Sequence, residues 1–175
     1  LEELTSRLTT FELVAKEATG LDFQKTSVTA LFEVLLAGAL ANRVSDMHFE
    51  AEEKQARVRF RIDGLLHDVL PNLPLHNYEN LVSRIKLLSG LKMNVHGEPQ
   101  DGRFTVKLVD KEIEMRVSII PSEFGETIVM RVLDPSAINV SVSDLGLRPD
   151  DYALVEAELE KPHGLILNTG PTGSG

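Results

Sequence analysis

Apolar residues recur at the spacing of an amphipathic helix in three stretches, each bounded by a residue that commonly starts or ends a helix. The second stretch is apolar on most of its sides, which predicts that it is buried. The predicted helices are residues 1–18, ended by Gly20; residues 28–43, capped by Thr26 or Ser27; and residues 78–88, ended by Gly90.

Between and after these helices the pattern changes to a period of two residues, which is typical of strands with one buried face. In residues 56–62 arginines alternate with apolar side chains, and the Asp63-Gly64 pair that follows is a strong signal for a two-residue hairpin. The predicted strands are residues 46–50, 56–62, 65–70, 104–108, 113–119 and 128–132, with turns near Asp110-Lys111 and over Pro121–Gly125.

Together these elements predict an α+β fold with a mostly antiparallel sheet and helices on one side. From residue 134 to 146 the pattern dissolves into a linker, Pro149 then opens a short helix to about Lys161, and a final strand covers Leu165–Thr169. This helix and strand are predicted to be the start of an α/β nucleotide-binding domain. The predicted divisions are an N-terminal helix and connector (1–26), an α+β domain (27–134), a linker (135–147) and the start of a nucleotide-binding domain (148–175).

Composition excludes several classes of protein. With 42% hydrophobic and 26% charged residues, the 175-residue chain is expected to form an ordinary soluble core. The net charge of −9 argues against binding to nucleic acid or to an anionic membrane surface. The absence of cysteine excludes disulfides and thiolate metal sites within this stretch. The longest apolar run, Val34–Ala41, is too short to cross a bilayer, and the start without Met suggests a piece of a longer chain.

The end of the chain has the form of a phosphate-binding loop. The apolar Leu165–Thr169 runs into a Gly-rich turn, whose backbone N–H groups can surround a β-phosphate. A complete loop continues with Lys and with Ser or Thr for the outer phosphates and Mg²⁺, and the sequence stops before either. The alternative is a Gly-rich surface turn or tail. The candidate nucleotide-binding residues are Gly170, Pro171, Thr172, Gly173, Ser174 and Gly175.

Arg116 and Arg131 are expected to lie across from one another. Both stand on the polar faces of strands joined by the Pro121–Gly125 turn, and keeping the apolar residues together places the two arginines on one face. Two such charges repel unless carboxylates or a bound anion lie between them. A pair of guanidinium groups can bind a γ-phosphate. The alternative is neutralisation by one of three nearby acids, Glu112, Glu114 or Glu126.

Three further groups of polar residues each have two possible interpretations. The stripe of Arg57, Arg59 and Arg61 is favoured as a solvated strand face paired with Asp and Glu, with a subunit contact as the alternative. On the preceding strand, Asp46, His48 and Glu50 could bind a metal or form hydrogen bonds; hydrogen bonding is favoured, and we assign no metal site. Asp101-Gly102-Arg103 is predicted to be a tight turn that directs Arg103 at a phosphate or at a backbone carbonyl.

Several stretches together resemble the type II secretion and type IV pilus assembly ATPases, the GspE/PilB-like family. They follow the family's order and spacing from about residue 28 to the end, with Val44 where the family usually has Ala. The matching stretches are Ser45–Glu50, Arg59–Gly64, Ser83–Lys86, Pro99–Arg103, Met115–Ser118, Gly125-Glu126, Met130–Asp134 and the Gly-rich end.

The resemblance implies a PAS-like α+β domain standing before a RecA-like ATPase domain that binds ATP and Mg²⁺. It implies a homo-hexamer on the cytoplasmic side of the inner membrane, held there by a platform protein and not by insertion of its own. In this family the domain before the ATPase supplies arginines to the phosphates, and the pattern places them at Arg116 and Arg131. We group Arg103 with them as a third candidate catalytic residue.

The expected function is therefore a part of an ATPase that couples ATP hydrolysis to pilin or pseudopilin assembly and protein export. The Walker A lysine, the acidic boxes, the Walker B region, the catalytic Glu and the family's zinc element would lie beyond Gly175, so this piece alone should not hydrolyse ATP. The alternative is a non-catalytic PAS-like module for assembly or ligand sensing. A nucleic-acid motor is disfavoured by the net charge.

Overall fold

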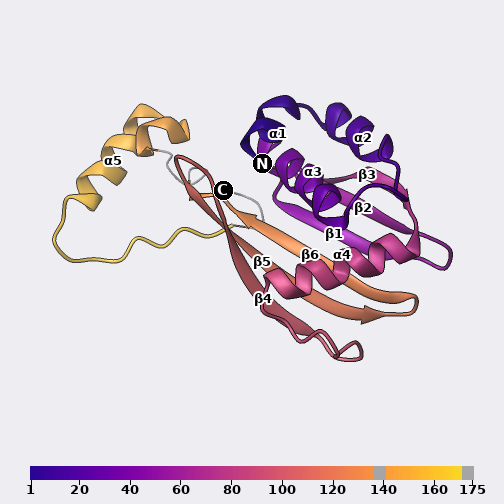
Figure 1. Cartoon of the computed structure of the whole chain (residues 1–175). Coiled ribbons are helices and arrows are strands. Elements are labelled where there is room, and N and C mark those ends of the chain that lie inside the picture. The colour runs from indigo at the N-terminus through magenta and orange to yellow at the C-terminus, as the bar shows by residue number, and fades with distance from the viewer. Residues whose placement is uncertain (136–140, 171–175) are drawn as a thin grey trace. The chain divides into compact units, whose positions relative to one another are not determined.

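The chain forms two compact units, Leu1–Asp134 and Pro135–Gly175, in a computed structural model that describes residues 1–135 and 141–170 (Figure 1). The first unit contains a six-stranded sheet in the order β3-β2-β1-β6-β5-β4. Every neighbouring pair is antiparallel, which confirms the predicted α+β class with an antiparallel sheet. The strands are β1 Asp46–Ala51, β2 Ala56–Ile62, β3 Leu65–Leu73, β4 Gln100–Lys107, β5 Glu112–Ser122 and β6 Gly125–Leu133.

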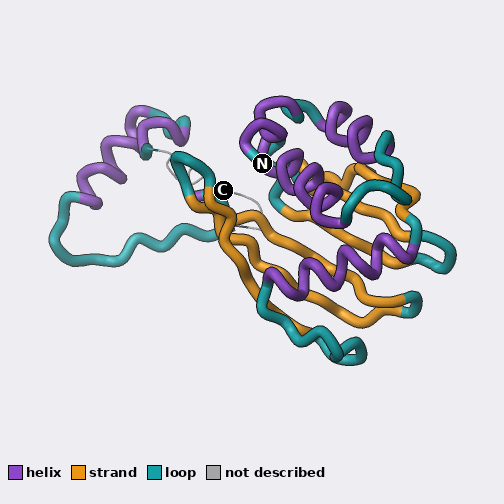
Figure 2. The backbone as a smooth tube through the Cα atoms, in the orientation of Figure 1, coloured by secondary structure: helices purple, strands orange, loops and turns teal. Residues whose placement is uncertain are grey.

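The helices of this unit cover one face of the sheet (Figure 2). Helices α3 (Val28–Ala41) and α4 (Leu75–Leu88) lie over the strands, while α1 (Glu2–Arg7) packs on α3 and α2 (Phe11–Thr19) packs on α3 and β3. Alternate strand residues point into the layer between sheet and helices, as the period of two predicts. The largest side chains that are fully buried there include Phe49, Phe60, Leu35, Met47, Met115 and Ile119.

The predicted helix over residues 1–18 is two helices, because Thr10 takes an extended conformation (φ −129°) and starts a new one. Its Oγ1 accepts a hydrogen bond from the Leu13 backbone N–H at 3.4 Å. A side-chain acceptor of this kind satisfies an unpaired N–H of the first turn, which favours a break at this point. Of the two residues predicted to cap α3, Thr26 and Ser27, it is Ser27 that does so, since its Oγ accepts from the Ala30 N–H at 3.2 Å.

The hairpin predicted at Asp63-Gly64 is confirmed. Both residues have positive φ, 49° and 81°, as a two-residue type I′ turn requires. The strand that follows does not end at residue 70 but continues through Pro71 to Leu73. A proline is compatible with β3 because this strand lies at the edge of the sheet and one side of its backbone has no partner strand.

Asp101-Gly102-Arg103 is not a turn, contrary to the sequence-based expectation. All three residues belong to β4, and Gly102 pairs with Val117 of β5. A Cβ at Gly102 would lie 2.6 Å from the Ser89 carbonyl oxygen and 2.8 Å from Leu91 Cδ2. Gly102 is therefore needed because β4 lies close to the chain that leaves α4, and not because the chain bends at this position.

Gly102→Ala should lower the free energy of unfolding by about 1–3 kcal/mol, because the added methyl group meets a backbone carbonyl that cannot move without disturbing the end of α4. Urea unfolding of the 175-residue chain followed by circular dichroism measures the change. Gly97→Ala is the matched control, since a Cβ there meets nothing within 4 Å. Equal stability of the two variants would contradict the assignment of close packing at Gly102.

The second unit contains a short 3₁₀ helix, Val142–Leu145, and helix α5, Pro149–Leu159, with Pro149 in its first turn as predicted. Residues 165–169, predicted as a strand, are not in a strand, and Leu165 and Leu167 are exposed. A strand exists only when a neighbour accepts and donates its backbone hydrogen bonds, and none pairs with this segment in the described part of the chain. No helix among the described residues is long and apolar enough to cross a membrane.

Candidate functional site

Three arginines lie in direct register across one end of the sheet. Arg103 of β4 pairs with Arg116 of β5, and Arg116 pairs with Arg131 of β6, which confirms that Arg116 and Arg131 face one another. We call Arg103, Arg116 and Arg131 the arginine row. Adjacent strands are about 4.8 Å apart, so the row spans about 10 Å. It lies on the face away from the helices, because the flanking residues Met115 and Met130 are buried on the other side.

Two carboxylates hold the arginine row. Arg116 Nε donates to Glu114 Oε1 at 2.9 Å, and Arg103 Nη1 lies 3.8 Å from Glu114 Oε2. Arg131 Nε donates to Asp46 Oδ1 at 2.9 Å. Of the three acids predicted as counter-ions, only Glu114 has this role.

Two of the predicted counter-ions are engaged elsewhere. Glu112 pairs with Lys107 at 3.0 Å, and Glu126 pairs with Lys86 at 2.7 Å. Asp46 was not predicted as a counter-ion. Its hydrogen bond with Arg131 depends on the pairing of β1 with β6, for which the sequence contains no local signal.

The geometry leaves the outer nitrogens of two arginines available. Arg116 and Arg131 each use Nε for a carboxylate, and their Nη atoms donate no hydrogen bond to the described residues. Their side chains are 68% and 65% exposed. A guanidinium held at Nε still presents its planar pair of Nη groups, the geometry that binds phosphate oxygens.

An open hollow of about 630 Å³ lies over the row, large enough for a phosphate group. Asp101 lines it on the same face as Arg103, so the β4 end is less favourable for an anion than the β5–β6 end. Exposed ion pairs contribute about 0–1 kcal/mol each, so a bound phosphate can displace Glu114 at little cost. The hollow is lined by Asp101, Gly102, Arg103, Arg116, Val117, Ser118, Val129 and Arg131.

The arginine stripe on β2 is paired, as the favoured interpretation predicts. Arg57 Nε lies 3.0 Å from Glu50 and 2.9 Å from Glu52, while Arg59 Nη2 reaches Glu50 at 2.5 Å. Burial alone would raise the pKa of Glu50, but the hydrogen bonds and charges of Arg59 and Arg57 outweigh it and the pKa is lowered. The same Glu50 hydrogen bond raises the pKa of Arg59.

The predicted hydrogen-bonding role of the polar residues of β1 is confirmed for Asp46 and Glu50. Asp46 accepts from Arg131 of β6 and lies 3.5 Å from Arg61 of β2, whereas Glu50 accepts from two arginines of β2. His48 lies between them on the same face. Burial, and then the charge of Arg61, lowers the pKa of His48. No group of three or more His, Cys, Asp or Glu within residues 1–135 and 141–170 is arranged to hold a metal ion.

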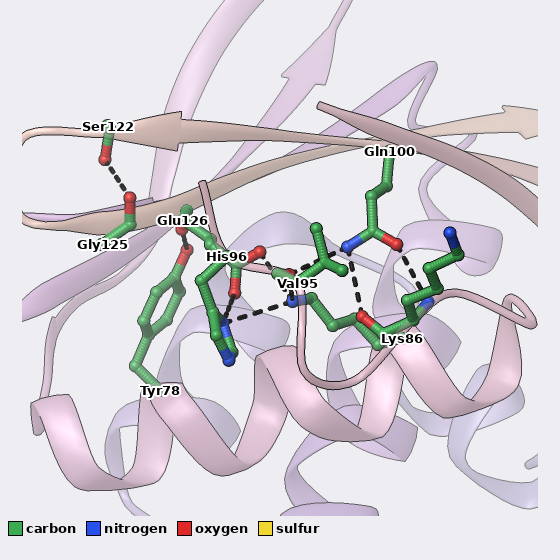
Figure 3. Close-up of polar contacts among 9 residues, drawn as sticks. Tyr78, Lys86, Val95, His96, Gln100, Ser122, Gly125 and Glu126 are labelled. Carbon is green, nitrogen blue, oxygen red and sulfur yellow. Dashed lines mark hydrogen bonds and ion pairs between the residues drawn. The ribbon is translucent and has the colours of Figure 1, made fainter. Parts of the chain in front are cut away.

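A second polar cluster lies on the helix side of the sheet (Figure 3). Lys86 of α4 is 1% exposed, and its Nζ lies 2.7 Å from Glu126 Oε1 and donates to the Val95 carbonyl at 2.7 Å. His96 Nδ1 lies 2.9 Å from Glu126 Oε2, so this ring nitrogen is assigned as the donor. The Tyr78 hydroxyl donates to the Glu126 carbonyl at 2.5 Å, and burial raises the pKa of Tyr78.

Gln100 fixes the loop that closes over this cluster. Its Oε1 accepts from the Lys92 N–H at 2.9 Å, and its Nε2 donates to the carbonyls of Lys92 at 3.2 Å and Val95 at 3.0 Å (Figure 3). Neither the buried ion pair of Lys86 with Glu126 nor the contacts of Gln100 were predicted from the sequence. One signal was present, because Lys86 stands four residues after Val82, on the apolar side of the predicted helix.

Of the candidate residues in the phosphate-binding loop, Gly170 is exposed and in no helix or strand. Pro171, Thr172, Gly173, Ser174 and Gly175 lie outside the described residues.

Comparison with known proteins gives the class of protein to which this geometry belongs. The family model for "Type II/IV secretion system protein" matches residues 22–175. The match covers most of the chain, and the chain therefore belongs to this family, as the sequence motifs indicate.

Individual relatives show which members of the family the chain is similar to. The type IV pilus assembly ATPase PilB of Myxococcus xanthus is 41% identical over 150 residues, covering 85% of this chain and 26% of the relative. The type II secretion system protein E of Pectobacterium carotovorum is 38% identical over 149 residues, 85% of this chain and 30% of its own. The chain thus spans less than a third of the length of these relatives. The ATPase DotB of Legionella pneumophila has a TM-score of 0.42 at 15% identity, over 75% of this chain and 34% of its own.

Proposed function

We propose that this chain is part of an ATPase of a secretion or pilus-assembly machine, in which the arginine row binds the phosphate groups of ATP. The observation that carries the proposal is the direct register of Arg103, Arg116 and Arg131 on an exposed face, where the Nη atoms of Arg116 and Arg131 donate no hydrogen bond to the described residues. The relatives of the chain support the same activity, since they include a type IV pilus assembly ATPase and a type II secretion system protein E.

In this proposal Arg116 and Arg131 donate hydrogen bonds to the γ-phosphate and stabilise the negative charge that it carries during transfer. Arg103 contributes charge from the edge strand. Gly170–Gly175 begins the loop that holds the β-phosphate of the nucleotide. The described residues do not fit a Mg²⁺ site of their own, so the cation that accompanies ATP is assigned no ligand here. The 175-residue chain alone is expected to be inactive, because its Gly-rich stretch Gly170–Gly175 does not include the Lys that a complete phosphate-binding loop needs.

The wider setting is part of the same proposal. A homo-hexamer would bring the arginine row of one subunit and a phosphate-binding loop into one nucleotide site. The hexamer would act at the cytoplasmic face of the inner membrane, attached through a platform protein, and rotation of its domains would drive assembly of pilin or pseudopilin subunits. Sedimentation of the full-length protein with and without a non-hydrolysable ATP analogue tests the hexamer.

The test of the activity is Mg²⁺-dependent ATP hydrolysis by the full-length protein and by the 175-residue chain under the same conditions. Hydrolysis is expected from the full-length protein only, and alanine variants of Arg116 and Arg131 test the arginine role in that assay. Hydrolysis by the short chain would contradict its assignment as an incomplete site. A full-length hexamer that binds no nucleotide would overturn the proposal in favour of a non-catalytic assembly module.

A further inference from the structure

The carboxylate of Asp46 lies at the centre of the sheet, between two arginines that face it from both neighbouring strands. Its register partners are Arg131 on β6 and Arg61 on β2. Its side chain is 9% exposed, although it stands on the face away from the helices. A carboxylate so nearly buried is retained only when several donors compensate for its lost hydration.

Each oxygen of Asp46 has its own donor. Oδ1 accepts from Arg131 Nε at 2.9 Å, while Oδ2 accepts from Ser45 Oγ at 2.9 Å and lies 3.5 Å from Arg61 Nε. Ser45 is itself fixed by backbone hydrogen bonds of 3.0 Å, from its N–H to the Arg61 carbonyl and from the Val132 N–H to its carbonyl. The acceptor of Arg131 therefore has little freedom to move.

Glu114, the acceptor of Arg116, differs in both respects. Its side chain is 35% exposed and belongs to the same strand as Arg116, two residues earlier. A flexible, solvated carboxylate can turn away when a phosphate arrives, whereas Asp46 cannot. The two arginines are thus held differently, Arg116 by a displaceable partner and Arg131 by a fixed one.

From this difference we infer that Asp46 is a positioning residue for phosphate transfer, which fixes Arg131 through Nε so that its two Nη groups stay aimed into the hollow over the row. The inference rests on the proposed function of Arg131. Its physical basis is that a donor oriented before the reaction stabilises the developing charge without the cost of reorganisation. Ser45 supports it by satisfying the oxygen that Arg131 does not use.

The test is a double-mutant cycle on ATP hydrolysis by the full-length protein, with Asp46→Ala, Arg131→Ala and both together. Asp46→Ala is expected to lower kcat by about tenfold or more while KM changes little, since the loss concerns charge that develops in the transition state. The double variant should be no slower than Arg131→Ala alone, because Asp46 acts only through that side chain. Asp46→Asn keeps an oxygen acceptor and should recover part of the lost rate.

Glu50→Gln is the matched control. Glu50 stands on the same strand and face and also joins two arginines, yet it touches none of the row, so kcat should be unchanged. A wild-type rate for Asp46→Ala, or full additivity with Arg131→Ala, would overturn the inference while leaving the role of Arg131 intact. A wild-type rate for Arg131→Ala itself would instead remove the proposed function on which the inference rests.

Discussion

Full-length protein carrying Arg131→Ala is expected to hydrolyse ATP about 100 to 1,000 times more slowly than the unmodified protein, which is the usual cost of removing one fixed donor to a developing negative charge. Arg116→Ala should lose a similar factor. Nucleotide affinity should change by less than about threefold, because the arginines act mainly on charge that grows during transfer. Steady-state kcat and KM, with affinity for a fluorescent ATP analogue measured separately, give the three quantities.

The position of each arginine sets the expected order of effects. Replacing Arg103 with alanine should lower kcat less than replacing Arg116 or Arg131. Arg103 lies on the edge strand beside Asp101, and its Nη1 lies 3.8 Å from Glu114. Lys107→Ala is the control, since Lys107 stands on the same strand and pairs with Glu112 outside the row. Arg131→Lys should be only partly active, because an ammonium keeps the charge but lacks the planar pair of donors. Unchanged kcat in both Arg116→Ala and Arg131→Ala would refute the assignment.

The facing pair of Arg116 and Arg131 could be predicted because the strands that carry them are joined by a short turn. Alternation fixes which residues share a face, and a turn between neighbouring strands restricts the register to a few values. The Asp63-Gly64 hairpin was predictable for the same reason, since only a few residue pairs adopt positive φ at two successive positions. Local contacts such as these can be predicted because a few adjacent residues determine them.

Contacts between distant segments could not be predicted in this way. Asp46 and Arg131 are 85 residues apart, and they meet because β1 joins the two hairpins at the middle of the sheet. The requirement for glycine at residue 102 comes from the Ser89 carbonyl on another element. The pattern around Gly102 therefore suggested a turn, whereas the cause of the glycine is tertiary packing in a strand.

Lys86→Met should lower the free energy of unfolding of the 175-residue chain by about 3–5 kcal/mol, because it leaves the buried carboxylate of Glu126 without its ammonium partner and removes one of the two donors to the Val95 carbonyl. The methionine itself fills most of the volume, so the loss comes from the unpaired charge and not from a cavity. For a chain of this length the change corresponds to a fall in Tm of roughly 10 °C. Chemical denaturation and thermal melting followed by circular dichroism measure both.

If the stability lost in Lys86→Met comes from the unpaired charge, removing the charge of Glu126 as well should restore part of it. The double variant Lys86→Met, Glu126→Leu removes both charges together, and it should be more stable than Lys86→Met alone, since an apolar pair can replace a buried ion pair without leaving a charge unpaired. A deficit that persists in the double variant would mean that Lys86 contributes through the packing of its methylene chain. The cluster that closes the loop before β4 would then depend on Gln100 rather than on the ion pair.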